Sequence, residues 1–133
     1  MTGQADSKTT GRTPKTILRR LPRMRNDRMG VSTREGVTIL RYTEILYCEA
    51  MGNYCRIYLR DQRSLVISKP LKRLSSVLPQ QEFVRTHQSY LVRFDEIATV
   101  GQDVELINGK ILPVSRGQRD TLMSLVRKQL PIV

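Results

Sequence analysis

Apolar and polar residues alternate over short stretches along most of the chain, and turn-forming residues separate these stretches. An alternation with a period of two is typical of β-strands that are buried on one face. The strongest hairpin signal is Asn108-Gly109, which has strand-like residues on both sides. Pro113 in the second of these strands indicates an edge strand or a strand end. The predicted strands cover residues 37–40, 45–50, 54–59, 65–68, 83–85, 90–94, 97–100, 104–107 and 110–114.

Two of these stretches, residues 45–50 and 54–59, are joined by Met51-Gly52-Asn53, which is a reasonable hairpin connection. The two cysteines of the chain lie in these stretches. We expect small buried hydrophobes in a reducing compartment, and no zinc site, because no CxxC or Cys/His spacing is present. In a hairpin the thiols could be cross-strand neighbours, but nothing in the sequence supports a redox role. The apolar residues expected on the inward face are Leu46, Cys48, Cys55, Ile57 and Leu59.

The apolar spacing changes to that of a helix in two places. Residues 70–79 begin and end with proline, and leucines recur between them at helical spacing, which predicts a helix of about two turns. Near the end of the chain, Ser115 and Gln118 have the spacing of a capping box. They precede a predicted helix whose apolar stripe is Leu122, Leu125, Val126 and Leu130. The fold class is therefore mainly β, with a short central helix and a C-terminal helix.

Composition adds a strong positive charge to this picture. The chain has 133 residues, which fits one domain, and its formal net charge is +11. The first 35 residues hold nine basic and three acidic residues, a net of +6, so the other 98 carry the remaining +5. A surplus of this kind attracts polyanions, with nucleic acid as the first candidate and an anionic membrane as the second.

The basic N-terminal segment is too poor in apolar residues to build a core. We predict a disordered tail over residues 1–31 and a globular domain over residues 32–133. An organellar transit peptide is the alternative interpretation of the tail, but Pro14 and Pro22 interrupt the amphipathic helix that it would need. No apolar run is long enough for a membrane span, so we expect no membrane insertion and a cytoplasmic protein.

Few residues of the chain are suited to catalysis. His87 is the only histidine, no Ser/His/Asp or Cys/His arrangement surrounds it, and no glycine-rich phosphate loop is present. The carboxylates of Asp95, Glu96, Asp103 and Glu105 fall on predicted turns, where such groups are usually solvated charges. We therefore predict no enzymatic activity, no catalytic residue, no cofactor and no metal site.

The segment FVRTHQSYLVRF, residues 83–94, is the most informative part of the chain. It places Arg85, His87, Gln88 and Ser89 in a polar turn between two apolar strands. Side chains of these types are the ones that recognise DNA, through arginine on phosphate or guanine, glutamine on adenine and serine on phosphate. The turn is therefore a candidate DNA contact.

Several motifs in order give the chain a specific resemblance. It resembles a LytTR-type DNA-binding domain, the output module of many bacterial transcription regulators, over about residues 32–130. The resemblance implies small antiparallel β-sheets in an elongated arrangement, whose loops enter successive major grooves in place of a recognition helix. The motifs are ILYCEAMGNYCRIYL (45–59), PLKRLSSVLP (70–79), FVRTHQSYLVRF (83–94) and NGKILPVSRGQRDTL (108–122).

The resemblance implies base contacts at three places. Gln88 and Arg116 match base-contacting positions of the family, and the turn that holds Asn53 and Tyr54 matches a loop that supplies a third contact. Which of the two turn residues points to the DNA is left open. The chemistry agrees, because arginine can bind guanine O6 and N7 and glutamine can pair with adenine N6 and N7.

Five further residues are expected to contact the DNA backbone or to orient the residues that do: Arg85, His87, Ser89, Arg93 and Arg119. For His87 a structural or phosphate-orienting role is favoured over base reading. The chain departs from the family at Gln88, where lysine or arginine is frequent, and at Arg93, where asparagine is usual. We expect Arg93 to add a phosphate contact or to lie in solvent.

These expectations combine into a sequence-specific, double-stranded DNA-binding transcription regulator. Its expected target is promoter repeats, and the 35 residues before residue 36 are too few to fold as a receiver domain. A homodimer on DNA and an inhibitory protein partner are left open. The alternative function is a basic RNA-binding or protein-interaction module, because charge alone does not separate these classes.

Overall fold

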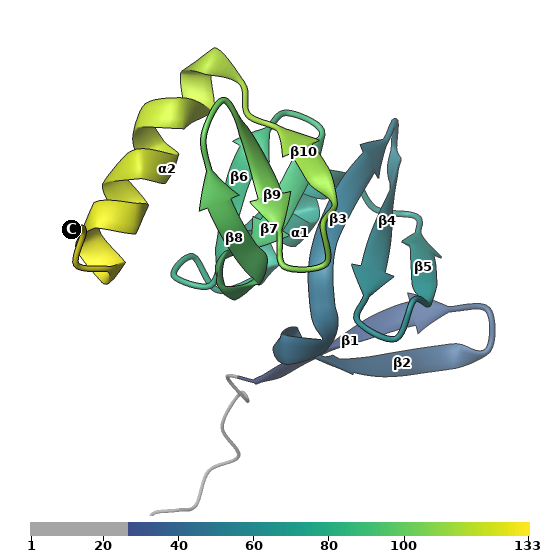
Figure 1. Cartoon of the computed structure of the whole chain (residues 1–133). Coiled ribbons are helices and arrows are strands. Elements are labelled where there is room, and N and C mark those ends of the chain that lie inside the picture. The colour runs from purple at the N-terminus through teal and green to yellow at the C-terminus, as the bar shows by residue number, and fades with distance from the viewer. Residues whose placement is uncertain (1–26) are drawn as a thin grey trace, which may run out of the picture.

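The computed structural model describes residues 27–133, which form three antiparallel sheets and two α-helices (Figure 1). Residues 1–26, which hold most of the predicted tail of residues 1–31 and the segment of the transit-peptide alternative, lie outside the described part. The elements in chain order are β1 (Arg28–Thr33), β2 (Gly36–Arg41), the 3-10 helix η1 (Tyr42–Glu44), β3 (Ile45–Met51), β4 (Tyr54–Leu59), β5 (Ser64–Ile67), α1 (Leu71–Val77), β6 (Phe83–His87), β7 (Tyr90–Arg93), the 3-10 helix η2 (Phe94–Glu96), β8 (Ile97–Val100), β9 (Asp103–Leu106), β10 (Ile111–Pro113) and α2 (Arg116–Gln129).

A five-stranded sheet in the order β5-β4-β3-β7-β6 forms the centre of the molecule. Its middle strand, β3, pairs with β4 on one side and with β7 on the other. The predicted hairpin of β3 and β4 is confirmed, with Met51 opposite Tyr54 and Gly52 at φ +66° in the turn between them. A positive φ is accessible to glycine at little cost, which explains why a glycine stands there.

The central sheet separates two apolar cores. Neighbouring residues of one strand serve opposite cores, as Leu91 and Val92 do on β7, because successive side chains of a strand point to opposite faces. One core lies toward α1 and the β1–β2 hairpin, and its members include Leu40, Ile45, Ile57 and Leu74. The other lies toward α2 and the three-stranded sheet, and its members include Tyr47, Val104, Leu112 and Leu122.

The expected inward face of β3 needs one correction. Leu46 was placed on the same face as Cys48, but it is half-buried and packs against the second core, whereas Cys48 belongs to the first. The pairing of β3 with β4 shifts register between Ile45 and Tyr47. Such an irregularity adds a residue to one strand and so breaks the simple alternation.

The smaller sheets explain the two ends of the described chain. In the sheet β10-β9-β8 the strands β9 and β10 flank the predicted Asn108-Gly109 turn, and Pro113 lies on the edge strand β10, as expected. In the other sheet β1 pairs with β2. The strand β1 begins at Arg28, so the boundary predicted at residue 32 falls inside it.

The two predicted helices are present. Pro70 is the N-cap of α1, and the helix ends before Leu78 and Pro79. Ser115 is the N-cap of α2, but its side chain makes no capping hydrogen bond, so the expected capping box does not form. The Gln118 N–H instead donates to the Ser115 carbonyl at 3.1 Å. Along the predicted stripe of α2, Leu122 is buried, whereas Leu130 at its end is 49% exposed.

Both cysteines are buried free thiols. Cys48 pairs with Ile57 and Cys55 with Ala50, so the two thiols are diagonal neighbours on one face and not direct cross-strand partners. Burial raises the pKa of the Cys48 thiol far above its usual range and that of Cys55 to about 11. The thiols are therefore protonated at neutral pH, which makes them inert and agrees with their expected role as small hydrophobes.

No helix in residues 27–133 is long and apolar enough to cross a membrane.

Candidate nucleic-acid interface

Three segments that are far apart in the sequence meet at one end of the molecule. They are the β3–β4 turn, the β6–β7 turn and the beginning of α2, which lie at the top in Figure 1. Two backbone hydrogen bonds tie them together. The Ala50 N–H donates to the Ser89 carbonyl at 2.8 Å, and the Ser115 N–H donates to the Thr86 carbonyl at 2.8 Å. The β6–β7 turn is therefore held between the other two segments.

The β3–β4 turn presents two of the expected contact residues. Asn53 is exposed in the turn, and Tyr54, the first residue of β4, is 52% exposed. Tyr54 lies opposite Met51, which is also exposed. Residues 51–54 close the hairpin of two strands that are paired within the central sheet, so their backbone is held by that pairing.

Interactions within the β6–β7 turn fix its backbone and leave one side chain outside. The His87 Nδ1 accepts a hydrogen bond from the Ser89 N–H at 3.1 Å. The guanidinium of Arg85 donates from Nε to the His87 carbonyl at 3.0 Å and from Nη2 to the Gln88 carbonyl at 2.7 Å. Arg85, His87 and Ser89 are half-buried, whereas Gln88 is exposed. The His87 ring is therefore engaged within the turn, and its structural or phosphate-orienting role stays a prediction.

The beginning of α2 supplies the third contact residue. Arg116 is the first helical residue, and its side chain is exposed. The preceding residue, Ser115, is the one whose N–H is held by the Thr86 carbonyl of β6. The N-terminus of a helix of 14 residues carries a partial positive charge and N–H groups that favour an anion. Arg116 therefore places an exposed cationic side chain at this helix end.

One expected DNA-contacting residue is placed elsewhere. Arg93 is only 7% exposed and lies at the end of β7. Its Nη2 and Nη1 atoms are 3.4 Å from carboxylate oxygens of Asp95 and the buried Glu96, and Glu96 also pairs with Arg60. The expectation that Arg93 lies in solvent is therefore wrong, and a phosphate contact would require its guanidinium to leave these carboxylates. Its charge is used inside the protein, where it neutralises a buried carboxylate.

Arg119 is also bonded within the protein. It lies one turn after Arg116 on α2, is half-buried, and donates from Nη1 to the Gly101 carbonyl at 2.7 Å and from Nη2 to the Gln102 carbonyl at 2.8 Å. These carbonyls belong to the β8–β9 turn. Arg119 thereby joins the first turns of α2 to the three-stranded sheet.

The family model of the LytTr DNA-binding domain matches residues 35–127, which is well over half of the chain. The chain belongs to the LytTR DNA-binding domain family. Its fold is similar to a solved structure described as the LytTR DNA-binding domain of a methyl-accepting/DNA response regulator from Bacillus cereus. That similarity has a TM-score of 0.65 at 19% identity and covers 75% of this chain and 96% of the other. No curated protein sequence matches the chain.

Family membership confirms three expectations. The recognition of a LytTR domain was correct, and so was the fold class of small antiparallel sheets with a short helix and a C-terminal helix. The family is a non-enzymatic DNA-binding one, which confirms that the chain is not an enzyme. This LytTR domain therefore acts in DNA-binding transcription regulation.

A cluster of tyrosines behind the turns of this LytTR domain was not anticipated. The carboxylate of Glu49 accepts hydrogen bonds from Tyr58 Oη at 2.9 Å and from Tyr90 Oη at 3.2 Å. Tyr47 stacks on Tyr58 with ring centroids 4.4 Å apart, and burial first, then Tyr58, raises the pKa of Tyr47 to about 12. The His87 ring lies 6.0 Å from that of Tyr90. The alternation of β3 places Tyr47 and Glu49 on one face, and this was the one sequence signal that could have revealed the cluster.

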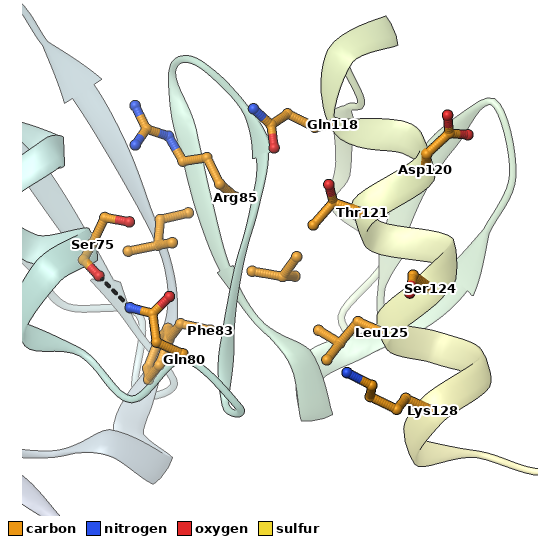
Figure 2. A pocket seen from close by; sticks show the side chains of 12 residues that line it. Ser75, Gln80, Phe83, Arg85, Gln118, Asp120, Thr121, Ser124, Leu125 and Lys128 are labelled. Atoms are coloured by element: carbon orange, nitrogen blue, oxygen red, sulfur yellow. Dashed lines mark hydrogen bonds between the residues drawn. The ribbon is translucent and has the colours of Figure 1, made fainter.

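A groove of about 510 Å³ runs beside the β6–β7 turn, between α1, β6 and α2 (Figure 2). Its lining includes Phe83, Arg85, Gln118 and Leu125. Among the described residues, Asp120 is the only carboxylate that lines the groove, and no histidine or cysteine of residues 27–133 lines it.

Proposed function

We propose that this LytTR domain binds double-stranded DNA in a sequence-specific manner, with its three turn segments entering successive major grooves. The observation that carries the proposal is the joint placement of the three segments by the Ala50–Ser89 and Ser115–Thr86 hydrogen bonds. A binding surface made of three short segments needs a fixed relative placement, because misplaced contacts cost affinity through lost preorganisation.

The side chains assigned to base contacts are those that remain outside the internal hydrogen-bond network. Gln88 is exposed while the residues on both sides of it are half-buried, and Arg116 is exposed at the helix end. In the proposed complex Gln88 pairs with adenine and Arg116 binds guanine through O6 and N7. Asn53 or Tyr54 supplies the third contact, since both are exposed in the β3–β4 turn.

His87 and Ser89 act one step away from the DNA in this proposal. The His87 Nδ1 already accepts the Ser89 N–H, and the Ser89 carbonyl accepts the Ala50 N–H. Both residues therefore keep the Gln88 turn in register with the β3–β4 turn. Arg93 has no place in the interface, because it is buried against Glu96.

Selection of bound duplexes from a random DNA pool tests the proposal. We expect the full chain to recover a defined sequence with conserved positions in separate major grooves. Repeating the selection with Gln88→Ala and with Arg116→Ala should relax different positions of that sequence, because each side chain reads its own base. The control is Arg127→Ala on the last turn of α2, whose recovered sequence should match that of the wild type. A pool without enrichment, or variants that recover the unchanged sequence, would contradict the proposal.

A further inference from the structure

Two half-buried arginines near the proposed interface donate hydrogen bonds from their guanidinium groups to backbone carbonyls. Arg85 bridges the carbonyls of His87 and Gln88, at 3.0 and 2.7 Å. Arg119 bridges the carbonyls of Gly101 and Gln102, at 2.7 and 2.8 Å. In both cases one planar guanidinium joins two consecutive residues of a turn. Arginine is suited to this geometry because its donors form a rigid fork.

The Arg85 bridge holds the residue that the proposed function assigns to adenine. Its two acceptors are the carbonyl of Gln88 itself and the one directly before it. The pairing of β6 with β7 shifts register between Arg85 and His87, so regular strand pairing does not by itself determine the turn. In Figure 2 the Arg85 side chain reaches away from α2, on the β6 side of the groove. Arg85 thus constrains the backbone from which the Gln88 side chain projects.

The Arg119 bridge does the same for the second base-contacting residue. Arg119 and Arg116 are three positions apart on α2, so both lie on nearly the same side of the helix. Its acceptors belong to the turn between β8 and β9, which is a separate part of the fold. The bridge therefore opposes a rotation of the first turn of α2 about its axis. Such a rotation would move the Arg116 side chain sideways relative to the other two segments.

We propose that Arg85 and Arg119 are positioning residues that set the sequence preference of the interface through Gln88 and Arg116, without donating to a DNA phosphate. This inference rests on the proposed function. Each guanidinium commits two of its donors to two carbonyls, so a bidentate grip on phosphate through the same donors would break both bonds. Giving up the carbonyls would leave two acceptors of each turn without their partners.

A lysine substitution distinguishes a positioning arginine from one that contacts phosphate. Lysine keeps the positive charge and binds phosphate as a point charge, but it lacks the fork that bridges two carbonyls. We expect Arg85→Lys and Arg119→Lys each to weaken binding to the selected duplex about tenfold. The affinity for a scrambled duplex of the same composition should stay unchanged. The salt dependence of binding to the selected duplex and to the scrambled duplex should also stay unchanged.

Double-mutant cycles identify the residue through which each arginine acts. In the Gln88→Ala background, Arg85→Lys should cost less than about a factor of two, because the side chain that it positions is already gone. In the Arg116→Ala background the same is expected for Arg119→Lys. The crossed pairs, Arg85→Lys with Arg116→Ala and Arg119→Lys with Gln88→Ala, should be additive. Arg127→Lys is the matched control, because Arg127 is exposed on the far end of α2, and it should leave binding to both duplexes unchanged.

Three results would overturn the inference. They are full retention of binding by the lysine variants, a flatter salt dependence on both duplexes for Arg85→Ala or Arg119→Ala, or additive cycles for the matched pairs.

Thermal unfolding of each variant checks that the fold persists, and a loss of the fold in both lysine variants would also count against a role confined to the turns. A wild-type protein that binds selected and scrambled duplexes equally would overturn the proposed function and this inference with it. A wild-type protein that discriminates, combined with additive cycles, would overturn the inference alone.

Discussion

Single side chains near the proposed interface differ in exposure and in their hydrogen bonds, and the roles we propose for them follow from that difference. Gln88 and Arg116 are exposed, whereas His87, Arg85 and Arg119 are engaged within the protein. The sequence motif grouped Arg85, His87, Gln88 and Ser89 around one turn between two strands, and the structure has them there. The motif did not separate the roles, because whether an arginine meets a carbonyl, a carboxylate or solvent depends on contacts that are distant in sequence.

Arg93 illustrates the limit of sequence reasoning at this scale. A cation at a position where the family usually has asparagine indicated a phosphate contact or a residue in solvent. The chain then bends into η2, which returns the carboxylate of Glu96 to the guanidinium of Arg93 and buries both. No periodic pattern announces a bend of this kind. Buried charges of this sort are tolerated only when they are paired, which is what the structure provides.

Substitution of Arg116 tests the assignment of a base contact. Arg116→Ala should lower specific affinity by about 1 to 3 kcal/mol and leave binding to scrambled DNA largely unchanged. The reason is that a bidentate contact with guanine contributes only where guanine is present. Titrations of both duplexes by fluorescence anisotropy measure the two affinities, with Arg127→Ala as the control for the loss of one charge. An equal loss on both duplexes would place Arg116 on a phosphate.

The buried thiols give a stability prediction at high pH. The pKa of Cys55 is raised to about 11 in the folded state from an ordinary value of 9.0, and that of Cys48 is raised further. Between the ordinary pKa and the raised one, the unfolded chain has lost the thiol protons and the folded chain retains them. The free energy of unfolding therefore falls as pH rises. It should be insensitive to these groups below about pH 8. Urea unfolding at a series of pH values measures this dependence of the free energy of unfolding on pH.

Cys55→Val supplies the comparison for that measurement, because valine keeps a small apolar side chain at the buried position. The variant should show a shallower fall in the free energy of unfolding between pH 9 and pH 11 than the wild type. Identical slopes for the two proteins would contradict the assignment of the titrating group to Cys55.

At the level of elements, local signals predicted most strands and both helices. The Asn108-Gly109 turn, the β3–β4 hairpin and the proline-bounded helix α1 were predictable because turn residues and spacing determine them locally. The strand β1 was missed because Arg28–Thr33 has only Met29 and Val31 as apolar residues and lies in a basic segment. Its pairing with β2, and not its own composition, makes it a strand.

The helix α2 shows the same dependence on context. Its predicted capping box does not form, and the Ser115 N–H is instead held by the Thr86 carbonyl. The placement of α2 therefore depends on tertiary contacts, chiefly the fully buried Leu122 in the second core. These contacts position Arg116 relative to the β6–β7 turn.

Truncation of Leu122 should therefore destabilise the whole domain. Leu122→Ala leaves a cavity in the second core, and we expect the free energy of unfolding to fall by about 2 to 5 kcal/mol. Leu130→Ala is the matched control, because the same change at a residue 49% exposed should cost far less. Urea denaturation followed by circular dichroism gives both values. Equal losses for the two variants would show that the second core does not anchor α2.

At the level of the whole molecule, the net charge of +11 divides into two unlike parts. Residues 1–35 carry +6 and the rest of the chain carries +5. The exposed residues assigned to base reading all lie in the second part. Charge on the first part can attract the DNA backbone without reading its sequence, because phosphates are the same at every base pair.

Removal of the N-terminal segment tests this division. Residues 1–26 contain seven basic residues: Lys8, Arg12, Lys15, Arg19, Arg20, Arg23 and Arg25. We propose that they add sequence-independent attraction. A chain that begins at residue 27 should show a salt dependence flatter by roughly 0.9 log unit per lost phosphate contact, with an unchanged ratio of selected to scrambled affinity. An unchanged slope would show that this segment makes no contact with the backbone, and a changed ratio would show that it reads sequence.

The affinity of the full chain for a selected duplex DNA, compared with a duplex RNA of matched sequence at the same salt concentration, tests the central claim most directly. The major groove of A-form RNA is too narrow and deep for protein segments to read, so the proposed insertion of the three segments requires the B-form groove. We predict a strong preference for the DNA duplex, and this preference should decrease in Gln88→Ala and in Arg116→Ala. Equal binding to the two duplexes would contradict it.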